Sequence, residues 1–235
     1  MMSEEDVKNH HKMVEELKKR EQKTDNLQVT LYNWGPCVVK FKIKDNFQKM
    51  LEAEAKLAEG DFTKQIAGQL DKELGFTTES KNKILPYLAP YLGAYDNVYE
   101  RFRGKKYDKK PEYFMSAMWI NYQRQYDFNP PHDHDGALSF IIYINIPEIL
   151  KKENAAYIGN SCGPGGVQMM WGDGPRGCMT NMSHFPEKGD MFIFPACLKH
   201  WVSHYKSDCV RVSISGNIHD SAQLNNIEQH VKDKT

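Results

Sequence analysis

The sequence predicts an α+β protein whose C-terminal part is a double-stranded β-helix (jelly roll), preceded by an N-terminal helical region. Two observations predict this fold. From Tyr113 onward the apolar residues change from a helical period of 3.6 to a strand period of 2. About eight short strands then follow, and glycine-rich connectors such as Gly163-Pro164-Gly165-Gly166 join them. Short strands after a helical lead-in are typical of a double-sheet jelly roll with helices on one flank.

The chain divides into four predicted segments, and its length of 235 residues fits one large domain or one domain with an appendage. Residues 1–23 form an N-terminal helix, and residues 24–112 form a support region of helices and strands. Residues 113–220 form the jelly-roll core, which carries every candidate catalytic residue. Residues 221–235 form a tail, either a short helix or a disordered end.

The support region mixes the two periods. Apolar residues occupy alternate positions in residues 27–32 and 38–43, and the turn residues Asn33-Trp34-Gly35-Pro36 separate them, so we predict two strands. Three helices follow in the prediction, over residues 47–58, 62–74 and 84–102. Pro86 and Pro90 are expected to interrupt the third, because proline lacks the N–H that a helix interior needs.

The strands of the core are predicted from alternating or continuous apolar runs bounded by turn residues. They cover residues 114–123, 129–134, 138–146, 167–171, 178–182, 190–194, 199–205 and 210–218. The polar, irregular stretch 151–166 is expected to be a loop over the mouth of the barrel.

Composition excludes several classes of protein. The 31 basic and 31 acidic residues give a formal net charge of zero, which provides no general argument for binding to nucleic acid or to a membrane surface. No apolar run approaches the ~20 residues that span a bilayer. The N-terminus is acidic and lacks the apolar core of a signal peptide. Five cysteines, an odd number without a C-x-x-C pair, indicate reduced thiols, so we expect a cytoplasmic protein.

Three histidines of the core fall at spacings that suggest a metal site. His132 and His134 enter a strand one residue apart, and alternate side chains of a strand share a face, so both are expected to point the same way. His200 begins another strand, after the turn Gly189-Asp190 and the buried strand over residues 190–194. Two ligands from one strand and a third from elsewhere leave open coordination positions for other molecules.

A facial set of two histidines and one carboxylate with open positions is typical of non-haem Fe(II) oxygenases. The carboxylate is usual two residues after the first histidine, and here that position holds His134. The predicted ligands of Fe(II) are therefore His132, His134 and His200. Asp135 is the alternative to His134, since a bulge near Gly136 could rotate the strand and bring the carboxylate inward.

Arg211 and Ser213 share one face of the last core strand, which forms a hairpin with the strand of His200. A guanidinium binds a carboxylate through two parallel hydrogen bonds, and a serine hydroxyl can add a third. A buried arginine needs a partner, and no inward-facing Asp or Glu is evident nearby. The expected partner is the carboxylate of an anionic co-substrate bound beside the metal.

With these residues the segment from Tyr113 to Asn217 resembles the 2-oxoglutarate- and Fe(II)-dependent oxygenases. It is most similar to an uncharacterised branch with an N-x-P-H-x-H entry, of which versions occur in marine phages, and it is distantly similar to prolyl hydroxylases. The resemblance implies that Arg211 and Ser213 bind the C5 carboxylate of 2-oxoglutarate. It also implies that Tyr143 bonds this carboxylate and that Asn121 lies near the co-substrate. For a phage-encoded protein the compartment would be the host cytoplasm.

The resemblance implies a dioxygenase that consumes O2 and 2-oxoglutarate and hydroxylates a prime substrate. A peptidyl substrate, such as a prolyl residue, is the favoured class. A nucleobase is the second, because the loop after Arg101 and Arg103 carries Lys105, Lys106, Lys109 and Lys110. A small metabolite is the third. A rival of another class is a non-catalytic jelly-roll module whose histidines bind a structural metal or none.

Overall fold

The computed structural model describes residues 35–63, 68, 70, 72–172 and 180–221. These belong to the compact unit Gly35–Thr235. The predicted N-terminal helix and the predicted strand over residues 27–32 lie outside the described residues, as does the tail from residue 222 onward.

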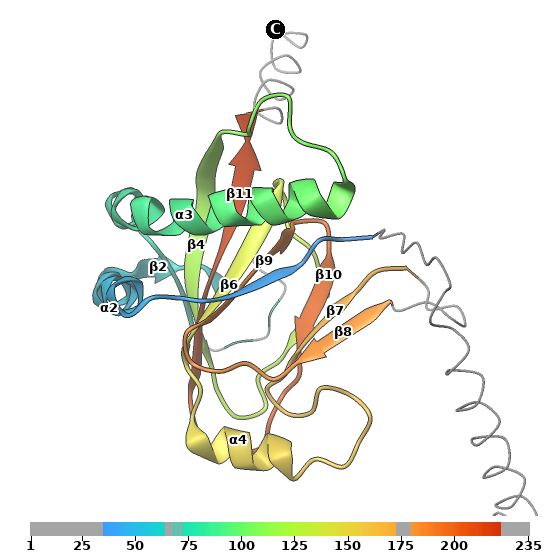
Figure 1. The fold of residues 1–235 in the computed structure, drawn as a ribbon. Helices are drawn as coiled ribbons and strands as arrows, with labels where there is room; N and C mark the ends of the chain where they lie inside the picture. Colours follow the sequence, from blue (N-terminus) through green and yellow to red (C-terminus); the bar gives the residue numbers. More distant parts are fainter. Residues whose placement is uncertain (1–34, 64–67, 69, 71, 173–179, 222–235) are drawn as a thin grey trace, which may run out of the picture. The chain divides into compact units, whose positions relative to one another are not determined.

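Two antiparallel sheets form the core of this unit (Figure 1). The major sheet has the strand order β1-β9-β6-β11-β4-β3-β2. Its strands are β1 (Val39–Lys42), β2 (Glu59–Asp61), β3 (Glu73–Gly75), β4 (Tyr113–Gln123), β6 (Leu138–Asn145), β9 (Asp190–Pro195) and β11 (Arg211–Asp220). The minor sheet has the order β5-β10-β7-β8. Its strands are β5 (Asn129–His132), β7 (Val167–Met170), β8 (Asn181–His184) and β10 (Lys199–Val202). This is the predicted jelly roll.

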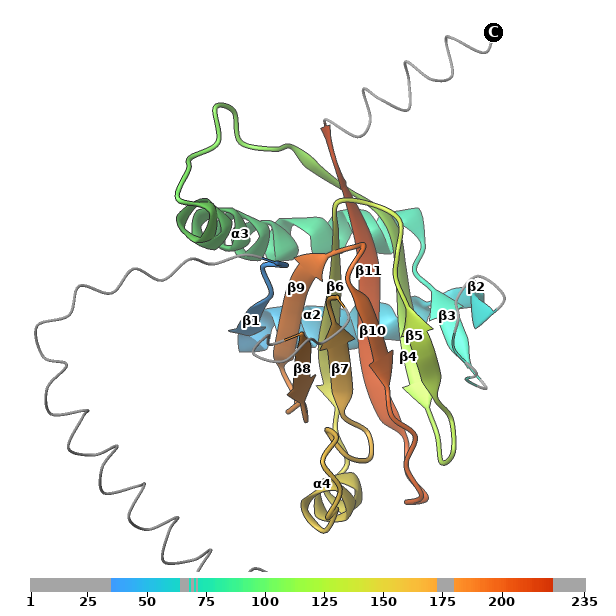
Figure 2. The same ribbon diagram turned by 90° about the vertical axis from the view of Figure 1, so that its right-hand side faces the viewer.

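Alternation along the central strands gives the major sheet two different faces. Ile142 of β6 and Ile214 of β11 belong to the cluster that packs against helices α2 (Asp45–Glu54) and α3 (Thr78–Arg103). Ile141 belongs to a second cluster, which includes Val167 of the minor sheet. Figure 2 shows the minor sheet in front of the major sheet, with α2 behind it. The inner face therefore lies between the sheets, where a pocket can form, and the outer face lies under the helices.

Helix α3 differs from the prediction because it runs without interruption through Pro86 and Pro90. It begins at Thr77, whose side chain accepts a hydrogen bond from the Ser80 amide at 3.1 Å, and it ends at Gly104 with a positive φ of 68°. Its apolar stripe packs on the outer face of the sheet, and this burial outweighs the hydrogen bonds that the prolines remove.

Two other predicted elements are wrong. The helix predicted over residues 62–74 is wrong in the part that the structure describes: residues 68, 70 and 72 are not helical, and Glu73 and Leu74 lie in β3, which pairs with β2 and β4. The apolar spacing suited a helix, but the open edge of β4 supplies hydrogen-bond partners and Leu74 packs on the helical side. The stretch 151–166 is also not entirely a loop, because helix α4 (Glu148–Ala155) includes its first part and buries Leu150.

Gly136 follows the histidine pair, and the backbone conformation at this position requires a glycine. Its φ is +112°, and a Cβ at this position would lie 2.8 Å from the carbonyl oxygen of Ile218. Gly136→Ala is therefore expected to lower the free energy of unfolding by about 1–3 kcal/mol, measured by urea denaturation. Gly93→Ala is the matched control, because nothing lies within 4 Å of its Cβ and it lies within α3; it should stabilise the protein by up to about 1 kcal/mol. Equal effects of the two substitutions would contradict this assignment.

Candidate metal centre and the adjoining pocket

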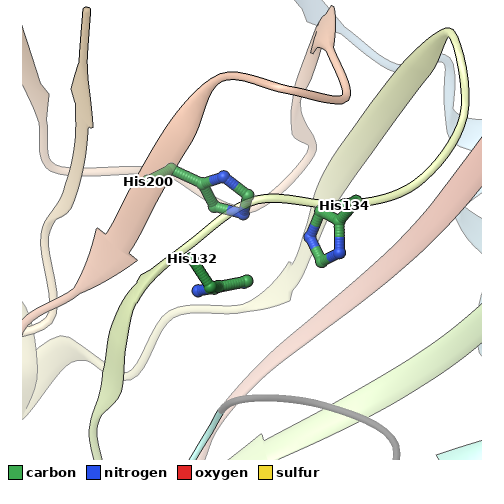
Figure 3. Close-up of side chains that lie close together, drawn as sticks. All are labelled: His132, His134 and His200. Carbon is green, nitrogen blue, oxygen red and sulfur yellow. The ribbon is translucent and has the colours of Figure 1, made fainter.

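His132, His134 and His200 converge at the inner side of the minor sheet (Figure 3). β5 and β10 are antiparallel neighbours in which His132 lies opposite His200. His134 follows two residues after His132, and its amide donates to the Ala196 carbonyl at 2.9 Å. One ligand atom from each ring lies within 4.8 Å of the other two, a spacing that could hold one metal ion. The predicted convergence of the three histidines is thus present in the structure.

Two of the rings are oriented by backbone carbonyl groups. His132 Nδ1 lies 2.7 Å from the Pro130 oxygen, and His200 Nδ1 lies 2.9 Å from the Leu198 oxygen. Because a carbonyl oxygen only accepts, Nδ1 is the protonated nitrogen in both rings. Nε2 is then left with a free lone pair, as in histidines that bind metals while the other ring nitrogen holds a hydrogen bond.

The three imidazoles are held in the neutral form. Burial, together with the neighbouring His200 and His132, lowers the pKa of His134 to about 3. Burial, then His132, lowers the pKa of His200 to about 4, and burial also lowers the pKa of His132. Neutral imidazole is the form that coordinates a metal, so no proton has to be removed at neutral pH before binding.

Asp135 does not join this cluster. Its side chain is 93% exposed, and its Oδ2 lies 4.0 Å from Nε2 of His219 on β11. The backbone amide of Gly136 donates to its Oδ1 at 2.8 Å. The geometry therefore favours His134 over Asp135 as the third ligand.

Arg211, at the start of β11, is buried beside the histidines with most of its donors unused. Its Nη1 donates to Gln123 Oε1 at 3.0 Å, and its guanidinium lies 4.9 Å from the ring centroid of Tyr143. Among the described residues Nε and Nη2 have no hydrogen-bond partner, and neither has the Tyr143 hydroxyl. Burial lowers the pKa of Arg211 and raises the pKa of Tyr143 to about 12. Gln123 was not predicted as a partner, although it shares the strand face of Asn121.

The register of the major sheet places four polar residues in one row across its inner face. Tyr143 on β6 lies opposite Ser213 on β11, Ser213 lies opposite Asn121 on β4, and Asn121 lies opposite Glu73 on β3. Asn121 Nδ2 lies 3.4 Å from Ser213 Oγ and 3.3 Å from Ser215 Oγ. The structure thus brings together all the predicted co-substrate residues and adds Glu73, which the prediction had placed in a helix.

A pocket with about 490 Å³ of empty space, partly open to solvent, lies between the two sheets. The three histidines and Arg211 line it. The other lining residues come from both sheets and from the segment before β3: Leu70, Trp119, Asn121, Gln123, Asn129, Ile141, Val202, Ser213 and Ser215. An anion held by Arg211 would lie in the same pocket as a metal held by the histidines.

The basic loop after α3 is not part of this pocket. Lys110 pairs with Glu100 at 3.6 Å and Lys109 pairs with Glu112 at 3.1 Å. The Arg103 guanidinium lies 5.1 Å from the ring centroid of Tyr107. None of these residues lines the pocket, so their charges give no support to the nucleobase alternative.

Residues 117–217 match the family model described as "Putative 2OG-Fe(II) oxygenase". Over these residues the chain is similar to the 2OG-Fe(II) oxygenases. The chain is therefore an enzyme with an oxygenase core that uses Fe(II) and 2-oxoglutarate, and O2 is its second co-substrate. Both the histidine cluster and the unpaired Arg211 donors fall within the matched residues.

Solved oxygenase structures are similar to the chain at low sequence identity. An oxidoreductase of the 2OG-Fe(II) oxygenase family from Burkholderia pseudomallei is 14% identical, with a TM-score of 0.48 over 77% of this chain and 84% of that one. A Pseudomonas putida prolyl-4-hydroxylase is 13% identical, with a TM-score of 0.45 over 77% and 91%. A Trichoplax adhaerens prolyl hydroxylase in complex with a peptide fragment is 10% identical, with a TM-score of 0.48 over 87% and 91%. No curated protein matches the chain.

The described part of the chain contains no helix that is both long and apolar enough to span a membrane.

Proposed function

We propose that the protein hydroxylates a peptidyl substrate, with Fe(II) held by His132, His134 and His200 and with 2-oxoglutarate held by Arg211. The observation that carries the proposal is the presence, in one pocket, of three neutral imidazoles and a buried guanidinium with two unpaired nitrogens. A rival structural-metal module would have no use for the second feature, because an unpaired buried cation costs free energy.

The donor set fits an iron ion. Each imidazole offers one nitrogen, and three ligands leave coordination positions for two oxygens of 2-oxoglutarate and for O2. Bound Fe(II) supplies the redox chemistry that couples decarboxylation of 2-oxoglutarate to oxidation of the prime substrate. This set carries no charge, whereas the usual triad includes a carboxylate, so the site would keep the full positive charge of the metal.

The residues of the chain have separate tasks in this proposal. Arg211 Nε and Nη2 donate to the C5 carboxylate. Ser213 and Tyr143 lie opposite each other on β11 and β6, and their hydroxyl groups add two further donors. Asn121 orients Ser213 through its amide nitrogen. The apolar residues between the sheets exclude water from the reacting groups.

Substitution of single ligands tests the metal site. Under anaerobic conditions His200→Ala and His134→Ala should each weaken Fe(II) binding by more than the ~10–100-fold that loss of an outer-shell partner causes. Both variants should also lose conversion of 2-oxoglutarate to succinate. Asp135→Asn is the matched control and should retain iron and turnover, because this side chain is exposed. Full iron affinity in His200→Ala, or its loss in Asp135→Asn, would overturn the ligand set.

The peptidyl substrate is proposed from the order of the site residues along the chain, which resembles that of prolyl hydroxylases. The test of this substrate class supplies peptides to the Fe(II)-loaded enzyme together with 2-oxoglutarate and O2. Mass spectrometry then searches the peptides for the addition of one oxygen atom. Oxidation of a nucleoside or of a free metabolite in place of every peptide would replace this proposal by its alternatives.

A further inference from the structure

Glu73 is a fully buried carboxyl group without a partner. Its residue is 0% exposed, and neither side-chain oxygen has a hydrogen bond within the described part of the chain. The ammonium of the preceding Lys72 lies instead 5.3 Å from the ring centroid of Tyr122, on the helical side of the sheet. A buried carboxyl group without a hydrogen bond costs free energy, so its presence in the fold calls for a ligand or another compensation.

Two side chains that line the pocket also present unpaired oxygens. Asn121, opposite Glu73 on β4, lines the pocket and is 7% exposed, and its Oδ1 has no partner among the described residues. The same holds for Oδ1 of Asn129, which also lines the pocket. The Asn121 amide orientation follows from its nitrogen, which lies 3.5 Å from the Ser213 carbonyl oxygen, an atom that can only accept. Its oxygen is therefore the atom left for a ligand.

The inner face thus has two chemically opposite ends. Around Arg211 the unpaired atoms are donors, which suit the carboxylate of the co-substrate. Around Glu73 the unpaired atoms are oxygens, and the carboxylates of Asp127 and Asp61 add negative charge nearby. A cation with several N–H donors suits this second end, because it can bind the unpaired oxygens and favour the ionised form of Glu73.

We propose that Glu73, with the side-chain oxygens of Asn121 and Asn129, binds an ammonium or guanidinium group of the prime substrate. The inference rests on the proposed function, because it assigns the substrate class of the same pocket. Glu73 is not among the residues that line this pocket but lies opposite Asn121, which does line it. Opposed positions on adjacent strands place the Cβ atoms about 4.5–5.5 Å apart, so one group with two or three N–H donors can reach both Glu73 and Asn121. The cation would neutralise the carboxylate and satisfy the buried oxygens together.

Calorimetry on the Fe(II)-loaded protein under anaerobic conditions tests the proposal, after saturation with 2-oxoglutarate. The probes are blocked pentapeptides Gly-Gly-X-Gly-Gly in which X is lysine, arginine, norleucine or proline, together with free L-lysine and L-arginine. Lysine or arginine, in the peptide or free, should bind at least tenfold more tightly than norleucine. The arms with peptides and with free amino acids distinguish a peptide from a small metabolite as the source of the cation.

Glu73→Gln should reduce this preference at least tenfold, since the amide keeps the size but loses the charge. Glu59→Gln is the matched control: it removes an exposed carboxylate from the neighbouring strand β2 and should leave the preference intact. No preference for the cationic probes, including no binding of any probe, overturns the inference. So does an unchanged preference in Glu73→Gln. Binding of 2-oxoglutarate, measured first, reports separately on the proposed function, which fails if that step fails.

Discussion

Arg211→Met should abolish the stabilisation of the protein by 2-oxoglutarate. In the wild type two unpaired nitrogens of a buried guanidinium are available to the carboxylate. Removal of one partner from such a buried, hydrogen-bonded charge pair costs about 2–5 kcal/mol of binding free energy. The dissociation constant of 2-oxoglutarate should therefore rise by about one and a half to three and a half orders of magnitude. Calorimetry on the metal-loaded protein measures it directly.

The same substitution should have little effect on the protein without co-substrate. Methionine keeps an unbranched apolar side chain in contact with the core, and the hydrogen bond to Gln123 is lost. The free energy of unfolding should change by no more than about 1–2 kcal/mol. Thermal unfolding with and without saturating 2-oxoglutarate separates the two effects, because only a ligand that binds the native state raises the melting temperature.

Arg124→Met is the control for loss of a positive charge. Arg124 is exposed and lies in the turn after β4, outside the pocket. Its substitution should leave the melting temperature shift with 2-oxoglutarate unchanged. An Arg211→Met protein that still binds 2-oxoglutarate with wild-type affinity would remove Arg211 from the co-substrate site.

Strand periodicity explains why most of the site could be predicted from the sequence. Side chains alternate along β4 and β11, so parity alone places Asn121 with Gln123, and Arg211 with Ser213, on one face. The predicted metal site of the three histidines then indicated which face of these strands points into the barrel. Predicting that His132 and His200 lie opposite each other also requires the pairing of β5 with β10. The sequence only suggests this pairing, because both strands follow turns.

The parts that could not be predicted depend on contacts between distant segments. Residues 62–74 have helical apolar spacing, yet β3 forms there because the edge of β4 accepts it. That error hid Glu73, since a charged residue in a predicted surface helix has no reason to be singled out. The continuation of α3 through Pro86 and Pro90 likewise depends on the sheet beneath it.

Glu73→Gln should stabilise the ligand-free protein at neutral pH. Burial, with the nearby charges of Asp127 and Asp61, raises the pKa of Glu73 from 4.5 to about 8. In the unfolded chain the carboxyl group ionises near its ordinary value, so between these two pKa values the folded state binds more protons than the unfolded state. Stability therefore falls as pH rises from about 4.5 to about 8. At pH 7 the loss amounts to about 3 kcal/mol.

Glutamine cannot ionise, so the variant should lose this pH dependence. Urea denaturation at pH 4 should give similar unfolding free energies for the two proteins, and at pH 7 the variant should be more stable by about 3 kcal/mol. Glu59→Gln should not change the difference between the two pH values, because Glu59 is exposed. The contrary result is a difference in stability between wild type and Glu73→Gln that is the same at pH 4 and pH 7. It would show that Glu73 is ionised in the native state and that other groups stabilise its charge. The buried carboxyl group of Glu73 lowers the stability of the ligand-free protein. A bound cation would offset this loss of stability, as expected of a binding site for a cationic substrate.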